Sequence, residues 1–387
     1  MNQPKKQEGP TLNTLDSVDE DVEIETIDDG ESTISKPYDP TQIRVDPKSF
    51  SLRNVLDMID DEDLDLAPDF QRMRVWTIQQ KSRLIESILL RIPLPAFYFS
   101  SNTEGRMQVV DGVQRLSTIH DFVRNKAFTL QHLEYLDREL GGKSFTDIER
   151  TLWAKRINTT QISVNVIDPQ TPNRVKFDIF KRINTGGTPL NAQEIRHCMS
   201  GKRVRDLLKR LTALKSFDVA TSGRLSGNLR MADRELALRW VAFTLLDKIT
   251  DYGGDRIGTL EDLLNVTTER VDLDETINLE VLIDRFDHAM TLAHALFGRH
   301  TFRKWMVGEN YRYPLNKALF EAWGVPLSQI NSESVLIQKK EYIQKAFRNL
   351  CSEDTFFISS ISAGTGDPKK VAYRFGKINE IIQSAVL

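Results

Sequence analysis

Cysteine is scarce in this sequence, which has only Cys198 and Cys351 among its 387 residues. Two isolated thiols supply neither a disulfide framework nor a zinc site, so the composition is typical of a reducing compartment. A run of about 18 apolar residues, which a membrane-spanning helix would need, is also missing. The N-terminus has two lysines with no apolar stretch behind them, so no signal peptide is predicted. We therefore expect a cytoplasmic protein without membrane contact.

Positive charge is sparse in the first 45 residues, although the whole chain has a net charge of only −3. This segment has eleven Asp and Glu against four Lys and Arg, and nine of the acids lie between Asp16 and Glu31. Such a segment buries too little apolar surface to offset its ordering entropy, so residues 1–45 are predicted to be a disordered acidic tail. The tail is either simply solvated or an arm that mimics DNA and covers the rest of the chain.

The apolar spacing predicts an α+β domain over residues 46–195 and a mainly α-helical domain over residues 196–387. The predicted elements of the first domain are, in order, a helix from Ser51, a helix from its N-cap at Thr77, a hairpin over 96–110, a helix after Gly112, a strand over 161–168 and two helices within 175–199, the second capped by Asn191. Beyond residue 196 helical patterns dominate and little strand is predicted.

The stretch VVDGVQRLST, Val109 to Thr118, predicts a strand, a glycine turn and a helix in immediate succession. The first N–H groups of a helix lack intrahelical acceptors and sit at the positive end of its dipole, which suits a phosphate. Arg115 would add a forked donor, and Gln114 would orient a water or a second oxygen. Asp111 would cap the helix, hold a metal through water or act as a base. The alternative is an ordinary turn, capped by Asp111, with Arg115 salt-bridged at the surface.

Two further segments carry polar residues that would suit the same anion. DFQRMRVW places Gln71, Arg72 and Arg74 on an extended stretch before a helix. RINTGG brings Asn184 and two glycines into a loop between helices. The alternative is that the arginines face solvent while the glycine loop simply turns the chain. A second Gln-Arg pair in so small a domain favours a shared anion pocket.

Four blocks occur together and in order, namely DFQRMRVW, LIESILLRIPLP, VVDGVQRLSTI and IFKRINTGGTPLNAQEI. They resemble the N-terminal domain of the GmrSD-type, modification-dependent restriction endonucleases, a prokaryotic family related to the ParB and sulfiredoxin fold. The resemblance covers residues 51–199. It implies a ParB-like domain with a small mixed sheet, which binds and hydrolyses a nucleotide and works with a DNA-cutting partner in defence against phage.

By motif match, the resemblance implies a nucleotide or phosphodiester site that contains a catalytic set and a binding set. Asp111, Gln114 and Arg115 would be catalytic. The nucleotide-binding residues would be Gln71, Arg72, Gly112, Arg115 and Asn184. The implied cofactor is a nucleoside triphosphate with Mg²⁺, and no separate protein-held metal site is predicted.

The sequence departs from the family in two respects. Family members usually carry Gln where this chain has Val113, so a polar contact at that position is lost or replaced. The usual HNH-type nuclease is not recognisable: His288, His294 and His300 fall on a helical pattern, and no hairpin precedes the Asp287–His288 pair. We interpret the six histidines as structural or surface residues. The nuclease would then be absent, or a separate subunit, or cleavage would fall to the first domain.

The start of the helical domain is basic, and we predict DNA-binding residues at Lys202, Arg203, Arg205 and Lys209. Contacts would go mostly to phosphates. The alternative is a solvated face. Further along the chain, several aromatic residues lie near basic residues. These aromatic residues would either stack on a base or belong to the core. These aromatic residues are Trp305, Tyr311, Tyr313 and Trp323, and the basic residues are Arg303, Lys304 and Arg312.

Three functions are consistent with these features. The first is an NTP-hydrolysing, DNA-associated component of a restriction-like phage-defence system, whose partners would be DNA, a nucleoside triphosphate and a separate nuclease subunit. The second is a ParB-like DNA or nucleotide sensor without turnover, acting through such a nuclease. The third is a metal-dependent DNA nickase that uses Asp111. The sequence does not predict the oligomeric state.

Overall fold

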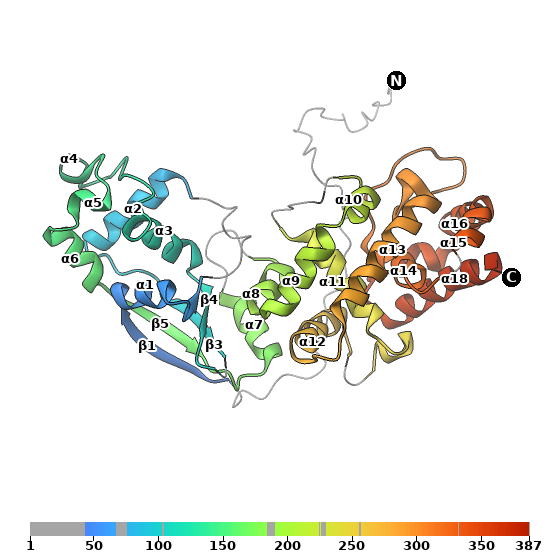
Figure 1. Cartoon of the computed structure of the whole chain (residues 1–387), viewed down its shortest axis with the longest axis horizontal. Coiled ribbons are helices and arrows are strands. Elements are labelled where there is room, and N and C mark those ends of the chain that lie inside the picture. Colours follow the sequence, from blue (N-terminus) through green and yellow to red (C-terminus); the bar gives the residue numbers. More distant parts are fainter. Residues whose placement is uncertain are drawn as a thin grey trace, which may run out of the picture.

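The computed structural model describes residues 43–66, 76–102, 104–183, 190–223, 225, 230–254, 257–331 and 333–386. It confirms the α+β class. Figure 1 shows a sheet with helices at one end of the molecule and an all-helical part at the other. No described helix has the length and apolar character needed to cross a membrane.

The described strands form one five-stranded mixed sheet in the order β1-β5-β3-β4-β2. The strands are β1 (Val45–Ser51), β2 (Leu64–Asp65), β3 (Phe97–Ser101), β4 (Met107–Asp111) and β5 (Gln161–Ile167). β1 pairs with β5 and β3 with β4 in antiparallel fashion, whereas β3 pairs with β5 and β2 with β4 in parallel. The predicted hairpin is β3–β4.

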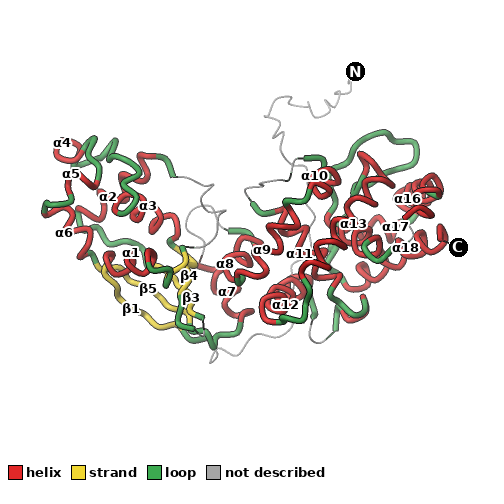
Figure 2. Tube along the Cα trace, in the orientation of Figure 1, coloured by secondary structure: helices red, strands yellow, loops and turns green. Residues whose placement is uncertain are grey.

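Successive residues of the central strands face opposite sides of this sheet, so each side has its own core. Phe97, Phe99 and Val109 are buried against one group of helices. These helices are α1 (Leu52–Asp60), α2 (Ile78–Leu89), α3 (Val113–Val123), α4 (Asp137–Leu140), α5 (Phe145–Ile148) and α6 (Leu152–Thr159). Figure 2 shows these helices gathered over the sheet.

Two further helices, α7 (Asn173–Ile183) and α8 (Ala192–Met199), belong to the second core. Phe177, Phe180 and Ile195 form this core with Val110 of β4 and Ile167 of β5. Helix α8 also contacts α11 (Ala232–Thr244) of the helical part. The predicted domain boundary between residues 195 and 196 remains a prediction, and it falls inside this shared helix.

The remaining described residues form the helical part. Its helices are α9 (Lys202–Thr212), α10 (Lys215–Thr221), α11 (Ala232–Thr244), η3 (Ile249–Asp251), α12 (Leu260–Leu273), α13 (Leu279–Phe297), η4 (Gly298–His300), α14 (Lys317–Leu327), α15 (Glu333–Gln338), α16 (Lys340–Glu353), α17 (Thr355–Ser360) and α18 (Pro368–Val386). Aromatic rings fill its core: Trp240 meets Phe286 edge-on at 5.0 Å, and Phe286 lies 6.2 Å from Phe320.

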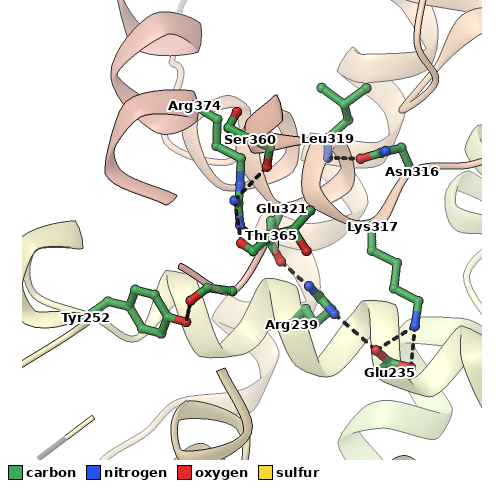
Figure 3. A network of polar contacts seen from close by, with 11 residues as sticks. Glu235, Arg239, Tyr252, Asn316, Lys317, Leu319, Glu321, Ser360, Thr365 and Arg374 are labelled. Carbon is green, nitrogen blue, oxygen red and sulfur yellow. Dashed lines mark hydrogen bonds and ion pairs between the residues drawn. The ribbon is translucent and has the colours of Figure 1, made fainter. Parts of the chain in front are cut away.

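A buried ion network ties α11, α14 and α18 together (Figure 3). The Arg239 Nε donates to Glu321 at 3.0 Å, and the Arg374 guanidinium donates to the other oxygen of the same carboxylate. Lys317 donates to both oxygens of Glu235 at 2.8 Å. Because a buried charge is costly unless it is paired, these ion pairs fix how the three helices meet.

Local sequence signals placed three helix starts correctly. Ser51 caps α1, Thr77 makes a capping box with Gln80, and Asn191 does so with Glu194. Strands β1 and β2 were not predicted. β1 lies at the sheet edge, contains Pro47 and is mostly exposed, so it lacks the usual alternation. Of the predicted acidic tail, residues 1–42 lie outside the described residues, whereas Val45 begins β1 and is therefore ordered, contrary to the prediction. The extended segment before Trp76 also lies outside the described residues.

Candidate functional site

The motif forms the predicted strand–glycine–helix turn. Asp111 ends β4, and Gly112 has a φ of +95°, which places it in the left-handed region that favours glycine. Helix α3 starts at the next residue, and no side-chain hydrogen bond caps its N-terminus within the described structure. The first N–H groups of α3 thus have no side-chain acceptor from a cap, and Gln114 lies in the same first turn.

Arg115 is turned toward the protein's own groups. Its guanidinium lies 4.2 Å from the ring centroid of Phe97 and donates to the carbonyls of Pro95 and Ala96, at 3.2 Å for the latter. It also pairs with the Asp111 carboxylate at 3.0 Å, and its side chain is 13 % exposed. Burial lowers the pKa of Arg115, while the Asp111 carboxylate opposes that shift. The arrangement clamps the start of β3 to the first turn of α3.

The predicted roles of Asp111 and Arg115 in chemistry therefore remain predictions. In the structure each is the other's partner, as in the ordinary-turn interpretation, although the pair is partly buried rather than at the surface. The prediction that Asp111 caps the helix was wrong, because its carboxylate pairs with Arg115 instead. The described part of the chain contains no group of three or more His, Cys, Asp and Glu side chains arranged to hold a metal ion. Gln71, Arg72 and Asn184 lie outside the described residues.

A cavity of about 1270 Å³ opens between the sheet and the helical part. Gln114, Ser117 and Thr118 of α3 lie in its wall, whereas Asp111, Gly112 and Arg115 are not among its lining residues. The wall continues through β4 with Gln108, and through α7, α8, α9 and α12 with Lys176, Arg196, Lys202, Arg205, Asn265 and Thr268. Only Gln114 of the predicted catalytic set therefore faces this space.

The cavity wall contains basic groups from both parts of the molecule. Lys81 of α2 pairs with Asp121 at 3.3 Å. Lys176 is buried and donates to the Pro169 carbonyl at 3.3 Å. Burial lowers the pKa of Lys176, against the attraction of Asp168 and Glu269.

Two of the predicted DNA-binding residues also reach this wall. Lys202 is exposed in the first turn of α9, and Arg205 pairs with Asp65 of β2 at 3.2 Å. Arg203 instead donates to the carbonyls of Val271 and Ile277, at 2.8 and 2.6 Å. Lys209 is exposed one turn beyond Arg205. Lys202, Arg205 and Lys209 are three and four residues apart, so they lie on one side of α9, and the role of the four residues in DNA binding remains a prediction.

Several cavity residues were not found from the sequence. Arg196 donates to Asn265 at 2.9 Å, and Asp272 accepts from the N–H groups of Gly201 and Val204 at 2.6 and 3.0 Å. Asp272 thereby fixes the start of α9, where Lys202 and Arg205 lie. A signal was available for α8, since a short helix with so many polar residues must find partners in the folded chain.

Comparison with known families finds a match over part of the chain. Residues 52–199 match the family model of the GmrSD restriction endonuclease, N-terminal domain. The match runs from α1 to α8, so it includes the motif and the sheet side of the cavity. It confirms the resemblance given by the four sequence blocks. No curated protein matches the chain.

Proposed function

Since residues 52–199 form a GmrSD-type N-terminal domain, we propose that the chain is a nucleotide-binding and nucleotide-hydrolysing component of a restriction-like phage-defence system. It associates with DNA and works with a separate nuclease subunit. One observation supports the nucleotide in particular: the cavity of about 1270 Å³ brings Gln114 of the motif together with basic groups of the helical part.

In this proposal the phosphates lie toward the basic residues of the wall. Lys81 comes from α2, Lys202 and Arg205 both come from α9, and all three line the cavity. The uncapped N-terminus of α3 adds N–H groups and the positive end of its dipole. The amides of Gln108 and Asn265 offer donors and acceptors for the sugar or base.

Magnesium bound to a nucleotide keeps several waters and is usually held by phosphates and one or two carboxylates. The lining contains carboxylates of this kind, Glu62, Asp121 and Glu269. They fit a nucleotide-borne Mg²⁺, whose chemistry is to neutralise charge on the phosphates. Gln114 orients the attacking water in this proposal.

The test is phosphate release from ATP, GTP, CTP and UTP, with and without DNA. Gln114→Ala is expected to lower turnover by about 100-fold, the usual cost of misplacing a reacting group. Gln338→Ala is the matched control, because Gln338 is exposed at the end of α15. Absence of phosphate release from all four nucleotides would exclude hydrolysis.

A second candidate function is a ParB-like sensor that binds without turnover. The observation that favours it is the engagement of Arg115 by Asp111 and by two main-chain carbonyls, which draws its guanidinium away from the cavity. Nucleotide-independent DNA binding without phosphate release would support this function. Under the first proposal, phosphate is released from a nucleotide, and DNA is expected to change the rate of that release.

A further inference from the structure

The segment between α13 and α14 carries a concentrated positive charge. Residues 298–316 include Arg299, Arg303, Lys304 and Arg312 against a single acid, Glu309; of the four, Arg303 and Lys304 are buried, while Arg299 and Arg312 reach the surface. Arg348 of α16 packs on the same segment, with its guanidinium 5.1 Å from the ring centroid of Trp305. None of these residues lines the cavity described above.

Arginines brace the exposed part of this segment, residues 306–313, which we call the 306–313 loop. Arg348 donates to the Met306 carbonyl at 3.2 Å, at the start of the loop. Arg299 donates to the carbonyl and side-chain oxygens of Asn310, at 2.9 and 2.5 Å. These acceptors are neutral, so the bonds hold the loop without cancelling either charge.

The imidazole ring of His300 lies among these positive charges. His300 stacks on Trp305 with ring centroids 4.3 Å apart and planes 3° from parallel. Burial, together with the neighbouring arginines, Arg299 and Arg348 first among them, lowers the pKa of His300 to about 4. At neutral pH His300 is therefore an uncharged flat ring in a positive environment.

The loop presents an aromatic ring beside these cations. Tyr311 is 63 % exposed, and its ring meets that of Tyr313 edge-on at 4.8 Å. The Tyr313 hydroxyl donates to Glu309 at 2.7 Å, so the one acid of the segment is hydrogen-bonded to the loop itself. Trp323 belongs to the core, whereas Tyr311 is on the surface, where its stacking on a base stays a prediction.

We propose that the 306–313 loop binds single-stranded nucleic acid, with Tyr311 stacking on a base and the surrounding arginines attracting the phosphates. Surfaces that bind single strands combine exposed aromatic rings with positive charge in this way. The chain's own acidic stretch, residues 16–31, matches the charge but has no aromatic residue to place on Tyr311. The assignment deepens the DNA-association part of the proposed function and uses no cavity residue.

The test measures fluorescence anisotropy of a labelled oligodeoxynucleotide of about 20 nucleotides, longer than the typical 4–16-nucleotide site. The full chain is titrated without nucleotide, so failure here leaves the hydrolysis test intact and the reverse also holds. Tyr311→Ala is expected to weaken binding by about 5- to 100-fold, the usual effect of removing one stacking ring. Tyr135→Ala is the matched control, since Tyr135 is 71 % exposed in the sheet part.

A second pair of variants tests the phosphate contacts. Arg312→Gln is expected to reduce the slope of log affinity against log salt by about 0.7, the value for one phosphate contact on a single strand. Arg210→Gln is its control, because Arg210 is exposed and pairs with Glu280 in the same helical part. Equal affinities of the Tyr311→Ala and Tyr135→Ala variants would overturn the proposal. Binding of a peptide of residues 16–31, with the oligonucleotide left unbound, would overturn it in favour of the chain's own acidic segment.

Discussion

At the scale of single residues, Gly112 is the position where the motif tolerates least change. A Cβ built on Gly112 would lie 2.2 Å from Cδ1 and 2.8 Å from Cε1 of Phe97, the ring on which Arg115 rests. The positive φ of Gly112 adds backbone strain for any other residue. The glycine thus permits both the tight turn and the Phe97–Arg115 contact.

Gly112→Ala is therefore expected to destabilise the protein by at least about 2 kcal/mol, from backbone strain and overpacking together. The measurement is the urea midpoint of unfolding. Gly105→Ala is the matched control, since Gly105 has a φ of +83° but nothing within 4 Å of its added Cβ. Equal losses in the two variants would show that the Phe97 ring does not constrain the turn.

The residue scale also shows where sequence reasoning stopped. The turn, the glycine and the first helical turn were predicted from local signals. The contacts of Arg115 were not, because its acceptors on Pro95 and Ala96 are 20 and 19 residues away in the chain. A motif predicts which side chains are close to a turn, whereas the fold decides which of them turn outward to a ligand.

At the scale of elements, the helices and the hairpin were predictable because their caps and periodicities are local. Strand β2 was not, because its two residues carry no pattern and are defined only by pairing with β4. The cavity lies beside this strand and beside α9, so it depends on the same long-range contacts.

Helix α8 is the element whose burial has a consequence for pH. His197 lies on it, 3 % exposed, and burial together with Arg234 and Arg205 lowers the pKa of His197 from 6.5 to about 3. As the pH falls below 6.5, the unfolded chain takes up a proton at this histidine while the folded chain does not. The contribution of His197 to stability is thus complete above pH 6.5 and decreases toward pH 3.

The expected slope from this one group is about 1.4 kcal/mol per pH unit between those limits. His197→Gln removes the titration, so its free energy of unfolding should fall less steeply than that of the natural chain between pH 6.5 and 4.5. Urea unfolding at a series of pH values measures this difference. His132→Gln is the control, because His132 is exposed. A slope in His197→Gln as steep as that of the control would contradict a buried, neutral His197.

At the scale of the whole molecule, the proposed nucleotide site depends on two parts with separate cores. Both polar and apolar side chains line the cavity between these parts, and a directed contact also crosses it. The pair of Arg205 with Asp65 spans this space from α9 to β2 at 3.2 Å. It therefore contributes to the spacing between the parts.

Reversing one charge of this pair should separate the parts. Arg205→Glu places two carboxylates opposite each other, and we expect a larger radius of gyration in small-angle scattering. Both side chains are partly exposed, at 22 % and 48 %, so the coupling energy in a double-mutant cycle should be about 0.2–1 kcal/mol. Adding Asp65→Lys to Arg205→Glu restores opposite charges and should restore the smaller radius.

The matched control is Arg210→Glu, with and without Glu280→Lys, because that exposed pair lies wholly within the helical part. If Arg205→Glu left the radius of gyration as unchanged as Arg210→Glu does, the spacing of the cavity would be set by the covalent path through α8 and not by the charge pair.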